Sequence, residues 1–338
     1  MARGELIRKL FKYYKMKNNS EFEKVALEVI AEEEQKNNHQ LAKDLMRILE
    51  GTNGSTSTFT VGPDAGNLPQ DREKHMPLVD IRKPDRIFPD IVLDQDHAEI
   101  IQKIMVEYRK AEVLNIHGLN PSNKILFCGP PGCGKTICTE IIAHELGIPL
   151  LYTRFDSIVS SYLGETSANL RKIFDFAASG RWVVMFDEFD AIGKARNDQN
   201  EHGELKRVVN SFLQMLDSFK SSSLVIAATN HEQLLDPALW RRFDEIVFFP
   251  MPTLKQIKDL LLLRLKNFPY ELEISNLASG LIGMSYADVE RICLDAIKSA
   301  IIGNQDKVTQ ATFDLALKNH KSRLSIAKTA YRKKSKDK

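Results

Sequence analysis

The sequence predicts an α/β fold in which helices cover both faces of a mostly parallel sheet, followed by a helical subdomain. From about Asp90 onward, short apolar strands alternate with helical runs, which is typical of a parallel sheet covered on both faces. After the tripeptide Pro-Met-Pro at 250–252, the pattern is purely helical to about residue 320. A glycine-rich loop joins the first of these strands to a helix. These observations favour an αβα sandwich with a smaller helical subdomain.

The composition is that of a globular protein with two or three domains. The chain has 338 residues, and its 43% hydrophobic content can fill a core. The charged residues nearly cancel to a formal net charge of +2, which gives no general argument for a nucleic-acid partner. No apolar run approaches the roughly 18–20 residues that span a bilayer, and Met1–Lys9 lacks a signal-peptide core. We therefore expect a cytoplasmic protein without a membrane span.

The four cysteines favour a reducing compartment rather than a metal site. Three of them, Cys128, Cys133 and Cys138, recur every five residues, which is not a usual spacing for zinc ligands. We expect the first at the end of a strand, the second in a loop and the third in a helix.

The first fifty residues carry helical periodicity and no strand pattern. Apolar residues recur at helical spacing from Leu6 to Leu49. Three short helices are too small a unit to be very stable alone, so this N-terminal module, residues 1–50, is expected to dock onto another chain. A protein client or a separate effector or protease would be such a partner. Residues 51–85, which begin with a stretch rich in Gly, Ser, Thr, Asn and Pro, are predicted as a linker.

Five apolar runs are predicted as the strands of a sheet domain at 86–250, and 251–320 as the helical subdomain. The last stretch, 321–338, holds eight Lys or Arg against one Asp. It is expected to be a solvated, disordered tail, with a polyanion-binding arm as the alternative. The predicted strands are Lys124–Cys128, Pro149–Thr153, Trp182–Phe186, Leu224–Ala228 and Glu245–Phe249.

The strongest chemical signal is the run Gly-Pro-Pro-Gly-Cys-Gly-Lys-Thr at 129–136, a full match to the P-loop pattern between a strand and a helix. Its glycines let the backbone fold so that N–H groups point at phosphates, and the helix N-terminus adds positive potential. Lys135 can then reach the β- and γ-phosphates, and the Thr136 hydroxyl can coordinate Mg²⁺. The predicted cofactors are therefore ATP and Mg²⁺, and the predicted ATP-binding residues here are Gly129, Pro130, Pro131, Gly132, Cys133, Gly134, Lys135, Thr136 and Ile137.

Two further predicted strands end in polar residues at the sheet edge where α/β folds bind ligands. Asp187 can hold Mg²⁺, and Glu188 is placed to polarise the attacking water. Asn230 would lie beside the γ-phosphate and could orient that water. The alternative for these residues is an ordinary solvated or turn-forming strand end. The P-loop about fifty residues earlier favours the functional interpretation of the acidic pair.

Together these motifs resemble those of the AAA family of ATPases in the narrow sense, over about Asp90 to His320. The resemblance implies a P-loop αβα sandwich with a helical lid and a ring, usually a hexamer. Residues 235–244 resemble the family's second region of homology, with Arg241 and Arg242 adjacent as in relatives of katanin and spastin. By resemblance, these arginines reach a neighbouring subunit's nucleotide and stabilise charge on the phosphoryl group. The alternative is two arginines on a solvated helix end.

Three further segments carry the resemblance. The run at 160–165, with Tyr162 and Leu163, resembles the first pore loop of members that pull polypeptide through a central channel, although a buried Tyr162 is the alternative. The run at 283–288 resembles the lid motif near the nucleotide, with Tyr286 in place of a glycine. The third segment is the pair Asp90-Ile91 at the start of the sheet domain. By resemblance, Gly283 and Ala287 of the lid motif contact the nucleotide, and Asp90 and Ile91 flank its base.

The predicted function is Mg²⁺-dependent ATP hydrolysis by an oligomeric ring that remodels, unfolds or threads a protein client. The sequence has no His-Glu-x-x-His motif, because His144-Glu145 and His231-Glu232 lack a histidine at the required offset. Any peptidase would therefore be a separate protein. Two alternatives remain, a nucleic-acid remodeller or loader, and an ATP-gated assembly scaffold with low turnover. Nucleic-acid binding is disfavoured but possible through the basic tail.

Overall fold

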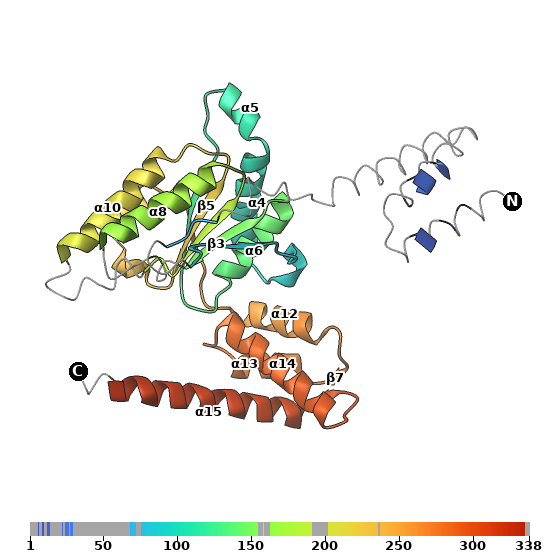
Figure 1. The fold of residues 1–338 in the computed structure, drawn as a ribbon. Helices are drawn as coiled ribbons and strands as arrows, with labels where there is room; N and C mark the ends of the chain where they lie inside the picture. The colour runs from blue at the N-terminus through green and yellow to red at the C-terminus, as the bar shows by residue number, and fades with distance from the viewer. Residues whose placement is uncertain are drawn as a thin grey trace. The chain divides into compact units, whose positions relative to one another are not determined.

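A computed structural model describes residues 68–71, 76–154, 158, 163–190, 202–235 and 237–334, and ten residues scattered between 6 and 29 (Figure 1). The chain divides into two compact units, Met1–Val61 and Gly62–Lys338. In the first unit, each described residue is helical, and Val25 is buried. The sheet, the C-terminal helices and the predicted nucleotide site all belong to the second unit.

The core of the second unit is a six-stranded sheet with the order β1-β3-β4-β5-β2-β6. Neighbouring strands are parallel except for β1, which pairs antiparallel with β3. The predicted α/β fold is confirmed, and the five predicted strands are present with ends that differ by at most one residue. The strands are β1 (Asp80–Arg82), β2 (Lys124–Cys128), β3 (Leu150–Arg154), β4 (Val183–Asp187), β5 (Leu224–Thr229) and β6 (Glu245–Phe248).

Helices cover both faces of the sheet because its central strands are apolar on both sides (Figure 1). Along β4, Val183 and Met185 face a core shared with α4 and α6, whereas Val184 and Phe186 face a core shared with α8 and α10. This alternation follows from the pleat, which points successive side chains to opposite faces. The helices of this part are α4 (Gln95–Arg109), α5 (Ala111–Ile116), α6 (Lys135–Leu146), α8 (Leu163–Ala178), α10 (His202–Ser218) and α11 (Pro237–Trp240), with short 3-10 turns η1 (Phe88–Asp90) and η3 (Glu232–Leu234).

The C-terminal helices form a subdomain with its own hydrophobic core. Two of them begin with a capping box, in which Thr253 pairs with Gln256 and Ser285 pairs with Asp288. Each box satisfies backbone N–H groups that a helix start would otherwise leave unpaired. These helices are α12 (Leu254–Leu265), α13 (Ile274–Gly280), α14 (Tyr286–Ile302) and α15 (Gln310–Lys334).

Three predictions about secondary structure were wrong. Part of the predicted linker, Asp80–Arg82, forms β1, and the preceding residues Leu78 and Val79 are buried in the sheet core. The C-terminal subdomain is not purely helical, because β7 (Tyr270–Glu271) pairs with β8 (Val308–Thr309). Strands of two or three residues are too short to show an alternating pattern in the sequence.

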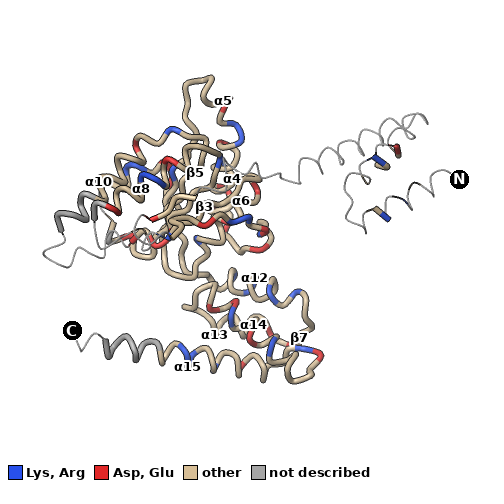
Figure 2. The backbone as a smooth tube through the Cα atoms, viewed as in Figure 1, with Lys and Arg blue, Asp and Glu red and all other residues tan. Residues whose placement is uncertain are grey.

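The third difference concerns the basic tail. Residues 321–334 continue α15, whereas the high charge of this stretch led us to expect disorder. Lys, Arg and Ala are good helix formers, so a basic composition does not oppose helix formation. Figure 2 shows Lys and Arg interspersed with Asp and Glu over the described helices, in agreement with the small net charge. None of the described helices is long and apolar enough to cross a membrane.

Candidate active site

The P-loop lies between β2 and α6, and its backbone geometry requires glycine at several positions. Gly129, Gly132 and Gly134 have φ angles of +129°, +74° and +98°. A Cβ atom on Gly129 would lie 2.2 Å from the carbonyl oxygen of Phe249, and one on Gly132 would lie 2.7 Å from Ser285 Oγ. Both distances are shorter than a nonbonded contact allows, so the loop packs closely against the residue that follows β6 on one side and the C-terminal subdomain on the other.

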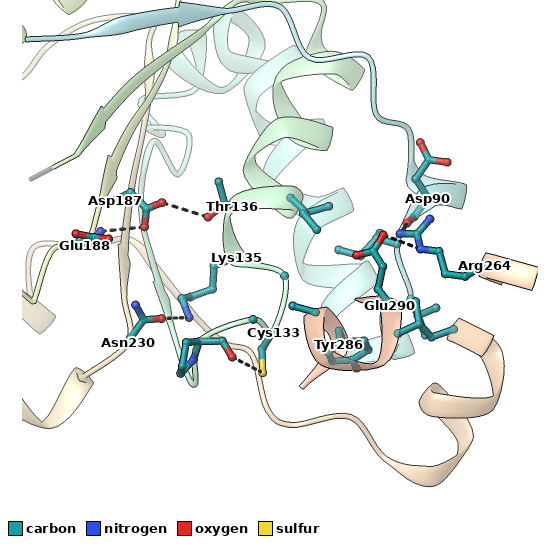
Figure 3. Close-up of a pocket in the computed structure, with 18 residues that line it drawn as sticks. Asp90, Cys133, Lys135, Thr136, Asp187, Glu188, Asn230, Arg264, Tyr286 and Glu290 are labelled. Atoms are coloured by element: carbon teal, nitrogen blue, oxygen red, sulfur yellow. Dashed lines mark hydrogen bonds and ion pairs between the residues drawn. The ribbon is translucent and has the colours of Figure 1, made fainter. Parts of the chain in front are cut away.

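A cavity of about 280 Å³ lies against this loop (Figure 3). It stands at the carboxyl ends of the parallel strands, where open α/β sheets bind ligands. Segments far apart in the sequence meet there, including the C-terminal subdomain. The predicted site residues that line it are Pro131, Gly132, Cys133, Gly134, Lys135, Thr136, Ile137, Asp90, Ile91, Asp187, Glu188, Asn230 and Ala287.

The Lys135 ammonium group is buried at the base of the P-loop. Its Nζ donates hydrogen bonds to the carbonyl oxygens of Gly129 at 2.7 Å and Pro130 at 2.9 Å, and to Asn230 Oδ1 at 2.8 Å (Figure 3). These three partners match the three donors of an ammonium group. Burial lowers the pKa of Lys135 from its ordinary value. The loop thus holds a desolvated cation next to the cavity, where it can interact strongly with a phosphate.

Asp187 ends β4 and faces the first turn of α6. Its Oδ2 accepts a hydrogen bond from Thr136 Oγ1 at 3.2 Å, and its Oδ1 accepts one from the Glu188 backbone N–H at 2.9 Å (Figure 3). A hydroxyl and a carboxylate are the hard oxygen ligands that Mg²⁺ prefers. Among the described residues, no cluster of three His, Cys, Asp or Glu could hold a metal alone. The pair therefore fits a Mg²⁺ ion that also takes phosphate oxygens and waters as ligands.

Glu188 has an unusual backbone conformation at the end of the same strand. Its φ angle is +55°, in the left-handed region that non-glycine residues seldom adopt. Its carboxylate is about half exposed and lies 3.5 Å from the Arg154 guanidinium. Such backbone strain clusters at functional sites, where the surrounding structure keeps it in place. Glu188 lines the cavity next to Asp187, and its carboxylate lies on the side of Arg154.

The other end of the cavity is formed by the C-terminal subdomain and the segment after η1. The Ala287 backbone N–H donates to the Gly132 carbonyl oxygen at 3.0 Å, which joins the P-loop to α14. Arg264 Nη2 donates to the Asp90 carbonyl oxygen at 3.1 Å, and Arg264 Nε lies 2.9 Å from Glu290 Oε1 (Figure 3). This end combines apolar side chains with an ion pair, as suits a nucleotide base and ribose.

Several predicted site residues do not line this cavity. Gly129 and Pro130 contribute only the carbonyl oxygens that hold Lys135. Gly283 precedes α14 with a φ angle of +85° and open space around it. Arg241 is exposed, and Arg242 donates to the Ala238 carbonyl oxygen at 2.9 Å and pairs with Asp217 at 3.4 Å. Neither arginine faces its own chain's cavity.

The first half of the predicted pore loop at 160–165 is outside the described residues. Tyr162 lies outside them, and Leu163 is described only as the first residue of α8.

Six residues of this region were not among the predicted site residues. Five line the cavity, and Tyr152 donates a hydrogen bond from its hydroxyl to Asp187 Oδ2 at 3.0 Å. Arg264 is part of an apolar helical run and Tyr152 of an apolar strand, so neither has a local pattern that indicates a role. Only Tyr286 carried a signal, as a departure from the lid motif. The five cavity residues are Val92, Leu260, Arg264, Tyr286 and Glu290.

Comparisons with known proteins show similarity to ATPases. Residues 125–251 match the family described as "ATPase family associated with various cellular activities (AAA)". Over 323 residues, the chain is 42% identical to an uncharacterized AAA family ATPase, y4kL, of Sinorhizobium fredii (strain NBRC 101917 / NGR234), covering 96% of this chain and 97% of that protein. Over 244 residues, it is 31% identical to the ATP-dependent zinc metalloprotease FtsH 3 of Sphaerobacter thermophilus, covering 70% of this chain and 50% of that protein.

The family match includes the strands that lead to the P-loop, to Asp187 and to Asn230. The similarity to y4kL extends over nearly all of both chains, whereas the chain matches only half the length of FtsH 3. These findings confirm the predicted ATPase activity with ATP and Mg²⁺ as cofactors. The chain belongs to the AAA family of ATPases.

Proposed function

We propose that the chain hydrolyses ATP with Lys135, Thr136, Asp187, Glu188 and Asn230, as a ring that remodels a protein client. The observation that carries this proposal is the convergence of these side chains. A buried ammonium, a hydroxyl, two carboxylates and an amide, from three separate segments, line one cavity beside a P-loop. This set supplies each group that phosphoryl transfer needs within one subunit.

Binding of the phosphates is assigned to the P-loop and Lys135. The loop's N–H groups and the start of α6 attract anions. Lys135 would exchange its carbonyl partners for oxygens of the β- and γ-phosphates. Thr136 and Asp187 would hold Mg²⁺, which shields the phosphate charge when bound.

Activation of the attacking water is assigned to Glu188, with Asn230 as the orienting residue. The Glu188 carboxylate is half exposed, so it can reach a water molecule in the cavity and accept its proton. Asn230 accepts a hydrogen bond from Lys135 through Oδ1, which leaves its amide N–H₂ group available as a donor to the water or the γ-phosphate. The two residues stand at the ends of neighbouring strands, β4 and β5.

The ring is proposed because the two predicted arginine fingers do not line the cavity of their own chain. A neighbouring copy can supply Arg241 and Arg242 to that cavity, and the family resemblance favours six copies. An arginine finger is worth about 10³–10⁵ in rate where it has been measured in GTPases. A double variant, Arg241→Ala with Arg242→Ala, should therefore bind ATP normally and hydrolyse it slowly.

Mixing experiments test this ring directly. Combining the double arginine variant with Lys135→Ala should restore part of the ATPase rate. In a mixed ring, some sites combine the intact Lys135 of one subunit with the intact arginines of its neighbour. Full activity of the wild type in a dilute sample that is monomeric by light scattering would contradict the proposal.

A protein client is favoured over a nucleic acid. The predicted pore loop at 160–165 offers an aromatic and an aliphatic residue for gripping an extended chain, and one relative is an ATP-dependent protease. We expect the protein to act in the cytoplasm, which suits its four free cysteines. Tyr162→Ala should abolish stimulation of ATP hydrolysis by an unfolded polypeptide while leaving ring assembly intact. Stimulation by DNA that falls steeply with salt would favour the nucleic-acid alternative instead.

A further inference from the structure

Tyr152 contacts the proposed magnesium ligand from a neighbouring strand. It lies on β3, opposite Met185 in the parallel register with β4, so Asp187 is two residues further along β4 on the same face. The Tyr152 hydroxyl donates a hydrogen bond of 3.0 Å to Asp187 Oδ2. The ring is partly buried and partly faces solvent. The geometry thus places a donor on the oxygen that also contacts Thr136.

Both oxygens of the Asp187 carboxylate have donors. Oδ1 accepts from the Glu188 N–H at 2.9 Å, and Oδ2 accepts from Thr136 at 3.2 Å and from Tyr152. The Thr136 hydroxyl oxygen is also proposed to coordinate the metal, which would change its hydrogen bond to Asp187. In that state, Tyr152 is the side-chain donor that still fixes the rotation of the carboxylate.

The edge strand β1 supports Tyr152 from the other side. The Arg82 guanidinium carbon lies 3.5 Å from the centroid of the Tyr152 ring, and Arg82 Nε is paired with Asp80 Oδ2 at 2.8 Å. A cation over the ring is attracted to its face, so Arg82 helps to hold the ring in place. The antiparallel pairing of β1 with β3 sets this position, with Asp80 opposite Tyr152. A chain of contacts therefore runs from Arg82 through Tyr152 to Asp187.

We infer that Tyr152 is a positioning residue for the Mg²⁺ site, and that Arg82 supports it. The inference rests on the proposed role of Asp187 as a metal ligand. Partners that orient a metal ligand are typically worth 10–100-fold in metal affinity. Mg²⁺ bound here would also take phosphate oxygens as ligands, so the loss of the Tyr152 hydroxyl should lower metal affinity by a factor close to the lower value.

The test is the affinity of the ADP complex for Mn²⁺, measured by electron paramagnetic resonance as a stand-in for Mg²⁺ and without turnover. Tyr152→Phe keeps the ring and removes the hydroxyl. It should lower Mn²⁺ affinity by about tenfold, while ADP affinity in EDTA stays within about twofold. Arg82→Met keeps an aliphatic chain over the ring and should lower Mn²⁺ affinity by a smaller factor.

The matched control is Tyr108→Phe, which removes a hydroxyl that donates to the Ser222 carbonyl oxygen at 2.7 Å, away from the site. It should leave Mn²⁺ affinity unchanged. The Asp187→Asn variant separates the inference about Tyr152 from the proposed role of Asp187 as a metal ligand. If Asp187→Asn weakens Mn²⁺ binding and Tyr152→Phe does not, the inference about Tyr152 is overturned and the proposed metal site stands. If Asp187→Asn has no effect, the proposed metal site itself is wrong.

Discussion

Lys135 Nζ donates a 2.8 Å hydrogen bond to Asn230 Oδ1. This bond joins the start of α6 to the residue after β5, although the two residues are far apart in the sequence. The same ammonium group also holds the first two carbonyl groups of the P-loop. The residue proposed to bind phosphate and the residue proposed to orient water are therefore positioned by one contact.

Lys135→Ala should lose most ATP binding. Hydrogen bonds to a charged group contribute about 1.5–3 kcal/mol each, so ATP affinity should fall by roughly 10- to 150-fold. The measurement is equilibrium binding of ATP by calorimetry. Lys103→Ala is a suitable control, because Lys103 is an exposed lysine paired with Glu245 away from the cavity. Equal affinities of the Lys135→Ala variant and the wild type would show that Lys135 does not contact the phosphates.

Gly132→Ala should weaken both the fold and nucleotide binding. Its φ angle of +74° is unfavourable for alanine, which costs roughly 1–2 kcal/mol of unfolding free energy. In addition, the new Cβ would lie 2.7 Å from Ser285 Oγ and 3.0 Å from Ala287 Cβ, in the C-terminal subdomain.

Gly118→Ala is the matched control for this variant. Gly118 has nearly the same φ angle, +73°, with no atom within 4 Å of the new Cβ. Chemical denaturation and ATP titration of both variants separate the two effects. Gly118→Ala should lower the unfolding free energy and leave ATP affinity unchanged, whereas Gly132→Ala should lower both. Equal ATP affinity in the two variants would show that the contact with Ser285 does not matter for binding.

Arg264→Ala should weaken ATP binding without changing the catalytic step. Arg264 joins α12 to the Asp90 carbonyl group and to Glu290 on α14, at the base end of the cavity. Its removal frees the Asp90 segment, and the loss of charged contacts worth about 1.5–3 kcal/mol each should raise the KM for ATP more than it lowers kcat.

The control for Arg264 is Arg323→Ala. Arg323 is an exposed arginine on α15 that pairs with Asp295 on α14 at 3.7 Å. An exposed pair of this kind contributes little, so steady-state kinetics should be unchanged. A lower kcat with an unchanged KM in Arg264→Ala would contradict a role in nucleotide binding.

Tyr152 should make stability depend on pH at alkaline values. Its pKa is raised to about 12 from an ordinary value near 10, so the folded state holds the phenol proton more tightly than the unfolded chain. This contribution is complete below about pH 10 and is lost as the pH rises toward 12. The difference in unfolding free energy between the wild type and Tyr152→Phe should therefore shift in favour of the variant between pH 9 and pH 11. A constant difference over that range would contradict the raised pKa.

The sequence predicted the parts of the site that are local in the chain. The P-loop, Glu188 and Asn230 each come directly after a buried strand, and Asp187 is the last residue of one. The strand assignment alone therefore predicts the edge of the sheet on which they lie. The five strands were found because each is an apolar run of four to six residues.

The remaining parts depend on tertiary packing. Arg264 and Glu290 are on different helices, and only the packing of α12 against α14 brings them to the cavity. Tyr152 reaches Asp187 because of the register between β3 and β4, which a single sequence does not reveal. The strand β1 is three residues long and contains two charged residues, so its place at the edge of the sheet follows from pairing and not from composition.

The most direct test of the central claim, that Glu188 activates the water that attacks ATP bound by Lys135, is the Glu188→Gln variant. The amide keeps the shape of the side chain but cannot accept a proton. This variant should bind ATP as tightly as the wild type, while the rate of phosphate release falls by about 10²–10⁴-fold, the usual contribution of a general base. Wild-type hydrolysis in this variant, or loss of ATP binding as large as that of Lys135→Ala, would contradict the account.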